Sequence, residues 1–107
     1  MSYRTNNCGE LRPSDIGKSV VLSGWVSKVR LMGSMAFVDI RDRYGITQLA
    51  FNEEENPDAL KHAEQLGREF VIRTRGLVRE RSSKNKQIAT GDIEVLVEGL
   101  EILNESK

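Results

Sequence analysis

The sequence predicts a small all-β domain with a single helix, and three observations support this prediction. Stretches with the apolar–polar alternation typical of strands recur along the chain, turn residues separate them, and one well-marked helix lies between the third and fourth stretches. With 107 residues, the chain suits one domain with a modest core. Five short-linked strands favour a sheet that closes on itself, with the helix covering one end.

The first long strand is expected at residues 18–30, after an irregular N-terminal segment and a helical turn at residues 13–17. Val20, Leu22 and Val26 lie in phase with Gly24, whose missing side chain indicates a bend or a close backbone approach. Trp25 falls on the opposite face, where we expect a partly buried packing residue.

The end of this strand carries two basic residues, Lys28 and Arg30, at a place where recognition groups are readily displayed. Residues 31–34 are then expected to turn the chain. Leu31 and Met32 are unusual residues for a turn, so they either fold back onto the core or touch a ligand.

Residues 35–52 predict a strand pair joined by a turn that ends at Gly45. Alternation places the branched residues of the first strand on the core face and Phe37 on the outer face. In the second strand, Gln48 shares the outer face with Ile46 and Ala50. An outward aromatic beside an amide and arginines suits a flat base and its hydrogen-bonding edge.

A helix is expected after this pair, because Asn56 can cap it, Pro57 fits its first position and Gly67 provides a stop. Its apolar stripe comprises Ala59, Leu60, Ala63 and Leu66. His62 lies off the stripe and is expected to face solvent without a catalytic role.

The fourth strand is expected at about residues 69–81, with a core face that runs from Phe70 to Val78 at every second residue. Its outer face carries Arg73, Arg75, Arg79 and Arg81. A polar loop follows at residues 82–87, and the last strand begins at residue 93 and continues towards Leu103. Glu94 is out of phase with its apolar neighbours, so we expect it outward, close to the basic loop.

The net charge is zero, with 16 basic and 16 acidic residues, so the chain is not a general polyelectrolyte binder. Basic residues nevertheless gather between residues 68 and 86, and such segregation can produce a basic stripe on a neutral protein. The one cysteine, Cys8, excludes an intrachain disulfide and is expected to pack, while the one histidine excludes most zinc sites. The absence of a disulfide favours a cytoplasmic protein. We expect no membrane partner, because no apolar run approaches the ~20 residues that span a bilayer.

Five strands that bend at Gly24 and Gly76 can close into a five-stranded Greek-key barrel with its helix between strands three and four. That is the OB-fold, whose second and third strands form the usual binding face. An open antiparallel sheet with one packed helix is the alternative, and closure is favoured because it removes exposed strand edges.

The sequence contains no glycine-rich phosphate loop, histidine pair, Cys-x-x-Cys or serine nucleophile signature. Asp39 and Asp42 lie beside Arg41 and Arg43, so hairpin ion pairs are expected in place of a catalytic carboxylate pair. We therefore predict a domain with no catalytic residue, cofactor or metal. Single-stranded nucleic acid is the favoured ligand. The alternatives are an OB-fold module for protein or oligosaccharide, or a general single-strand binder.

Several segments are similar to one known family: residues 3–12 (YRTNNCGELR), 22–26 (LSGWV), 37–48 (FVDIRDRYGITQ), 89–95 (ATGDIEV) and 102–104 (ILN). They resemble the N-terminal domain of bacterial aspartyl-tRNA synthetases, of the class II aspartyl, asparaginyl and lysyl subgroup. The resemblance implies an OB-fold domain over residues 1–107 that binds the anticodon loop of tRNA(Asp). It also implies a larger catalytic domain after Lys107, which attaches aspartate using ATP and Mg²⁺. The full-length enzyme would be a homodimer and the fragment a non-catalytic monomer.

The resemblance also implies roles for individual residues. The stacking aromatic under the middle base corresponds to Phe37, the amide that reads this uracil corresponds to Gln48, and Arg30 assists there. The positions near the other bases correspond to Arg79, Arg81 and Asn85 for the third base and Glu94 for the first. Lys28 joins this set as the other basic residue at the end of the first strand. The sequence departs from the family at Val29 and Leu31, where an arginine and an aspartate are common.

Overall fold

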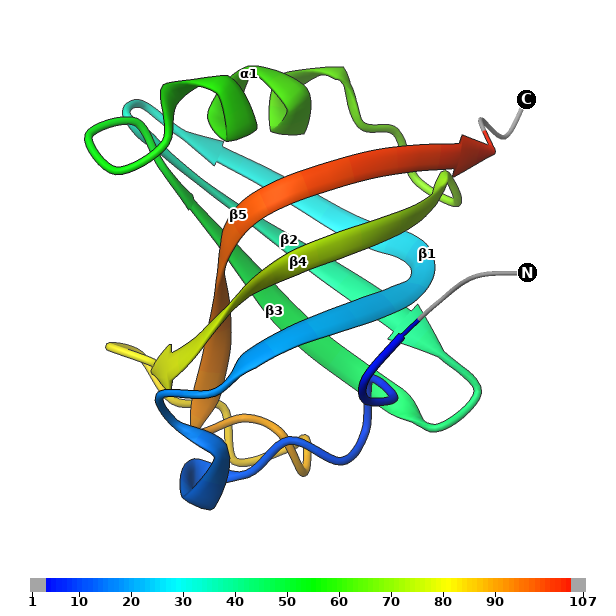
Figure 1. Ribbon diagram of the computed structural model, residues 1–107, viewed down its shortest axis with the longest axis vertical. Coiled ribbons are helices and arrows are strands. Elements are labelled where there is room, and N and C mark those ends of the chain that lie inside the picture. The colour runs from blue at the N-terminus through cyan, green and yellow to red at the C-terminus, as the bar shows by residue number, and fades with distance from the viewer. Residues whose placement is uncertain (1–3, 105–107) are drawn as a thin grey trace.

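The computed structural model describes residues 4–104, and within them the five strands form a closed barrel (Figure 1). The elements in chain order are η1 (Pro13–Asp15), β1 (Ser19–Met32), β2 (Met35–Asp42), β3 (Gly45–Asn52), α1 (Pro57–Gln65), β4 (Val71–Glu80) and β5 (Ile93–Asn104). Around the barrel the strand order is β1-β2-β3-β5-β4, and the barrel closes between β4 and β1. The prediction of a closed barrel over an open sheet is confirmed.

Strand β1 is long and bent, so it can pair with a different strand along each half of its length (Figure 1). Its first half pairs with β4 and its second half with β2, with a register shift between Val26 and Lys28. A Cβ atom on Gly24 would lie 2.3 Å from the Arg41 carbonyl oxygen, and one on Gly76 would lie 2.3 Å from the Leu96 carbonyl oxygen. Both predicted bends are therefore places where another backbone approaches too closely for any side chain.

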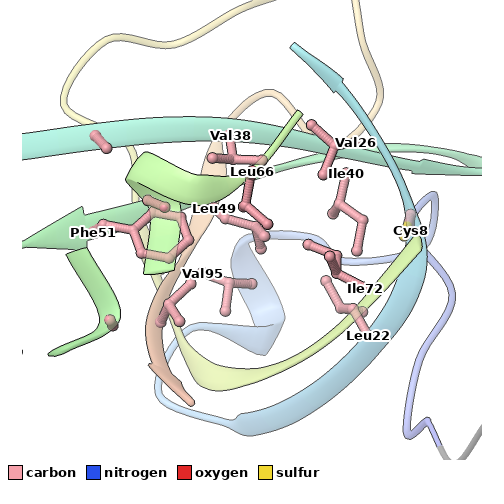
Figure 2. Packing of buried hydrophobic residues seen from close by; sticks show 14 of the residues in the cluster. Cys8, Leu22, Val26, Val38, Ile40, Leu49, Phe51, Leu66, Ile72 and Val95 are labelled. Carbon is pink, nitrogen blue, oxygen red and sulfur yellow. The ribbon is translucent and has the colours of Figure 1, made fainter. Parts of the chain in front are cut away.

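The barrel interior is filled by the apolar faces that alternation predicts (Figure 2). Strands β1, β2 and β4 each alternate buried and more exposed residues over their paired segments. Phe51 is the largest of the fully buried side chains. Cys8 packs in the same cluster, and burial, reinforced by the nearby Asp42 carboxylate, raises the pKa of its thiol. Cys8 is thus a packing residue, as expected, and stays neutral at ordinary pH.

Helix α1 lies across one end of the barrel, between β3 and β4 in sequence (Figure 1). The Asn56 side chain accepts a hydrogen bond from the Ala59 backbone N–H at 3.1 Å, which confirms the predicted cap. The buried face comprises Ala59, Leu60 and Ala63, whereas His62 is exposed. Within residues 4–104, no helix combines the length and the apolar character needed to cross a bilayer.

Two local predictions about the hairpins were wrong. Leu31 and Met32 do not form a turn, because β1 continues through them and the chain reverses at Gly33, whose φ is +65°. Asp42 does not pair with its neighbours Arg41 and Arg43 in the described part of the chain. Its carboxylate instead accepts backbone hydrogen bonds within the turn and from Cys8, and it pairs with Arg4 at 3.4 Å. The N-terminal segment, through Arg4 and Cys8, therefore binds the Asp42 carboxylate in place of the neighbouring arginines.

Candidate nucleic-acid interface

A cleft of about 430 Å³ opens on the barrel surface where β1, β2 and β3 meet the segment after β4. It combines one aromatic ring, one amide, two guanidinium groups, two thioethers and two hydroxyls. The residues that line it are Arg30, Met32, Met35, Phe37, Gln48, Arg81, Ser82 and Ser83. Such a mixture of a flat apolar surface and hydrogen-bond donors suits an unstacked nucleobase.

Phe37 forms the flat wall of this cleft. It stands on the outer face of β2, half-buried, with the buried Ala36 and Val38 on either side facing the core. Arg30 is its partner across the β1–β2 ladder, and the guanidinium carbon lies 5.6 Å from the ring centroid. This cation–π contact places the Arg30 guanidinium, a charged donor, over one face of the Phe37 ring.

Gln48 lines the cleft on the face of β3 that alternation predicts, outside the core cluster, but other side chains cover it. The residue is only 6% exposed. Its Oε1 accepts hydrogen bonds from Arg30 Nη2 at 2.9 Å and from Arg81 Nη2, while its Nε2 donates to Glu94 Oε1 at 2.9 Å. Alternation along β3 could not predict this burial, because the side chains that cover Gln48 come from other parts of the chain. They are Arg30 of β1, Arg81 just after β4, and Glu94 of β5.

Glu94 lies beneath Gln48, and the prediction that it faces outward was wrong. It is 4% exposed, and its Oε2 accepts a hydrogen bond from Arg79 Nε at 2.7 Å. Arg79 reaches Glu55 as well, at 3.5 Å. A buried carboxylate is tolerated here because a guanidinium neutralises it and both of its oxygens accept hydrogen bonds.

Arg81 departs from its predicted outward position in the same way. It follows the end of β4, where its backbone N–H donates to the Asp92 carbonyl oxygen, and it is 8% exposed. Its side chain folds over the barrel end, where it bonds Gln48 and the Gly91 carbonyl oxygen. Its Nε–H has no hydrogen-bond partner among the described residues, although this atom is buried.

The predicted basic stripe on β4 is largely neutralised by the neighbouring strand. Arg73 pairs with Glu101, and Arg75 lies 3.9 Å from Glu98, both on β5. These two arginines of β4 are therefore not free positive groups.

A family model described as an OB-fold nucleic acid binding domain, of the tRNA anticodon type, matches residues 20–103. The chain belongs to this family. The match covers the helix and all five strands except the first residue of β1 and the last residue of β5, and it includes every residue that lines the cleft.

This OB-fold nucleic acid binding domain is similar to parts of longer enzymes. It is 59% identical over 102 residues to the aspartate–tRNA ligase of Bacteroides thetaiotaomicron, covering 95% of this chain and 17% of the relative. It is 58% identical over 106 residues to that of Porphyromonas gingivalis, covering 98% of this chain and 18% of the relative. The chain thus spans less than a fifth of the length of these curated relatives.

Solved structures share the fold. The asparaginyl-tRNA synthetase of Pyrococcus horikoshii, complexed with asparaginyl-adenylate, matches with a TM-score of 0.81 and 30% identity, covering 100% of this chain and 24% of that one. An OBody bound to hen egg-white lysozyme matches with a TM-score of 0.85 and 28% identity, covering 99% of this chain and 98% of that one.

Four of the eight predicted site residues line the cleft of this OB-fold domain, namely Arg30, Phe37, Gln48 and Arg81. Glu94 and Arg79 do not line it but join it through hydrogen bonds, from Gln48 to Glu94 and from Arg79 to Glu94. The other two predicted residues lie apart. Lys28 is exposed on β1 opposite Asp39, and Asn85 lies in the loop after β4, where its Oδ1 accepts the Gln87 backbone N–H at 3.0 Å. Neither lines the cleft. Sequence reasoning missed Met35, Ser82 and Ser83 as lining residues, and only the nearness of Met35 to Phe37 could have indicated one of them.

Proposed function

We propose that this domain binds the anticodon loop of tRNA(Asp) as the recognition module of an aspartate–tRNA ligase. The observation that carries the proposal is the placement of the Phe37 ring in a cleft whose other walls supply N–H donors. Membership of the OB-fold nucleic acid binding family and the identity to aspartate–tRNA ligases support it.

Under the same proposal, the aminoacylation reaction takes place in a catalytic domain that is not part of residues 1–107. A longer protein would attach aspartate to the tRNA in a separate catalytic domain that uses ATP and Mg²⁺, as a cytoplasmic homodimer. Residues 1–107 would form one monomeric binding domain that supplies affinity and specificity without chemistry.

The cleft would read a splayed base by stacking and by hydrogen bonding at once. A base stacked on Phe37 would present its edge to Arg30, Arg81 and the free N–H of Gln48. Because these groups donate, the edge that fits best carries carbonyl oxygens, as uracil does. Cytosine carries an amino group in place of one of these oxygens, so its N–H donors would face the N–H donors of the cleft and no hydrogen bond would form there. We assign this position to the central base of the anticodon.

The flanking basic and polar residues are assigned to neighbouring nucleotides. Arg79, near the end of β4, and Asn85, in the segment between β4 and β5, are proposed to act near the third base together with Arg81. Lys28 is exposed and has no polar side-chain contact among the described residues, so it is proposed to meet a phosphate.

The proposal predicts that the domain prefers an anticodon stem-loop of tRNA(Asp) over a linear oligonucleotide of the same sequence, because a loop presents its bases already splayed. Titration of both RNAs by fluorescence anisotropy, at several salt concentrations, checks this. Binding should weaken as salt rises, since phosphate contacts release counterions. Equal affinity for the two RNAs would indicate a general single-strand binder.

A protein-binding function is the second candidate, because an OBody bound to lysozyme shares this fold over nearly its full length. That likeness indicates that a barrel of this shape can present its surface to a protein. The same titration separates the two functions. Failure to bind the stem-loop at low salt would favour the protein-binding module, or one for oligosaccharide.

A further inference from the structure

We propose that the surface around Trp25 and Tyr44 is a docking site for the polypeptide that follows residue 107 in a longer protein. The docked segment would place an apolar side chain against the two aromatic rings and carboxylates against the neighbouring guanidinium groups. This inference rests on the proposed function, under which the chain continues into a catalytic domain. We call this surface the aromatic patch, and it forms a hollow of about 310 Å³ that is lined by Arg4, Ser23, Trp25, Asp42, Arg43 and Tyr44.

The first argument is that two large aromatic side chains lie exposed at one place. Trp25 is 40% exposed and Tyr44 is 56% exposed, and both line the same hollow. Neither residue lines the cleft that holds Phe37, so the proposed RNA site does not account for their exposure. Tryptophan and tyrosine are enriched at the buried centres of protein interfaces, where they carry much of the binding energy. The exposure of this pair therefore favours a protein segment that covers it.

The second argument is the position of Trp25 relative to the end of β5. Trp25 of β1 pairs with Val71 of β4, and Val71 pairs with Asn104, the last residue of β5. Two spacings between neighbouring strands separate Trp25 from Asn104, which is roughly 10 Å. Figure 1 shows the end of β5 and the bend of β1 on the same side of the barrel. A chain that continues from β5 therefore leaves the barrel next to the aromatic patch and can reach it through a short loop, at a small cost in entropy.

The third argument is charge. Arg41, the partner of Trp25 on β2, and Arg43 are exposed, and neither meets a carboxylate within residues 4–104. Asp42 is the one carboxylate that lines the hollow, and it already accepts hydrogen bonds from Arg4 and from backbone N–H groups. The aromatic patch is therefore positive, and an acidic segment complements it.

RNA is another polyanion that a positive surface could attract, and the surroundings of the Tyr44 ring argue against it. The guanidinium carbons of Arg4 and Arg43 lie 5.6 Å and 5.7 Å from the centroid of this ring. A base that stacked on the ring would compete with these cation–π contacts. A carboxylate could instead bind the same guanidinium groups through their N–H donors without displacing them from the ring. A protein segment with carboxylates therefore fits the aromatic patch better than a base does.

Hydroxyl-radical footprinting with mass spectrometry tests the proposal, because oxidation of a side chain slows when the side chain is covered. The samples are residues 1–107 alone, the same residues with the tRNA(Asp) stem-loop, and the longer protein without RNA. In the longer protein, oxidation of Trp25 and Tyr44 should slow towards the rate of the buried Phe51, while Phe37 reacts as it does in residues 1–107. The stem-loop should protect Phe37 and leave the oxidation of Trp25 and Tyr44 unchanged.

Substitutions in the longer protein test the same contact by a second route. Trp25→Ser and Tyr44→Ala should each accelerate proteolytic cleavage after residue 104 by roughly tenfold or more, since the protease cuts the undocked form. Leu77→Ala is the matched control, because it removes an apolar side chain that is 36% exposed and lies outside the hollow. It should change the cleavage rate by no more than about twofold. Tyr44 lies at a turn, so Tyr44→Ala keeps the test available if Trp25→Ser does not fold.

Equal oxidation of Trp25 and Tyr44 in the longer protein and in residues 1–107 would overturn the proposal, as would equal cleavage of both patch variants and Leu77→Ala. Protection of Trp25 and Tyr44 by the stem-loop would also overturn it, because the aromatic patch would then belong to the RNA-binding surface. If the stem-loop protects no residue, the proposed function fails. The comparison between residues 1–107 and the longer protein would still decide whether the aromatic patch is a docking site.

Discussion

Replacing Phe37 with alanine is expected to weaken binding of the tRNA(Asp) anticodon stem-loop by roughly 5- to 150-fold. The magnitude follows from the value of a base–aromatic stack, ~1–3 kcal/mol, where each 1.4 kcal/mol is about tenfold. Phe37 is the one aromatic residue that lines the cleft. Arg30 also loses the ring that its guanidinium faces, so positioning of a neighbouring donor is lost with the stack. Anisotropy titration at fixed salt measures the effect.

Two variants show whether this loss comes from stacking. Phe37→Tyr keeps a ring in the cleft and should bind within a few-fold of the wild type. Tyr44→Ala removes another exposed aromatic, at the turn between β2 and β3, and should leave binding unchanged because this residue does not line the cleft. Equal loss in Phe37→Ala and Tyr44→Ala would contradict a specific stacking role for Phe37.

Replacing Phe51 with alanine is expected to lower the free energy of unfolding by ~3–5 kcal/mol, the usual cost of truncating a buried aromatic residue. Phe51 is fully buried and lies in the main cluster of the barrel (Figure 2). The total stability of a domain of this size is about 5–15 kcal/mol, so this variant is close to unfolding. Urea denaturation followed by circular dichroism gives the change in midpoint.

The matched control is Leu77→Ala, on the outer face of β4, where 36% of the residue is exposed. Because little apolar surface is lost from the core there, the change should cost about 1 kcal/mol or less. If Phe51→Ala were no more destabilising than Leu77→Ala, the barrel interior would not be packed as described.

The positions of the strands along the chain and their core faces could be predicted because alternation and the two glycine bends are local signals. Val38, Ile40 and Leu49 follow period two, and all are buried in the barrel. The start of the helix at Asn56 could also be predicted, because helix capping depends on residues that are close in the sequence. These features required no knowledge of which strands meet.

The state of the site residues could not be predicted in the same way, because it depends on contacts between distant segments. Gln48, Arg81 and Glu94 all read as outward by alternation, and all three are buried. The hydrogen bond from Gln48 to Glu94 joins residues 46 positions apart, across the parallel contact between β3 and β5. Barrel closure brings these polar groups together and lets each one satisfy another, which a strand pattern cannot reveal.

The central claim is that this cleft reads the middle base of an anticodon. Its most direct test is the affinity of the wild-type domain for two stem-loops that differ only in whether the central base is uracil or cytosine. Recognition by a cleft rich in N–H donors predicts that the uracil loop binds at least about tenfold more tightly, since the amino group of cytosine leaves a buried donor unpaired. Equal affinity for the two loops would contradict the claim.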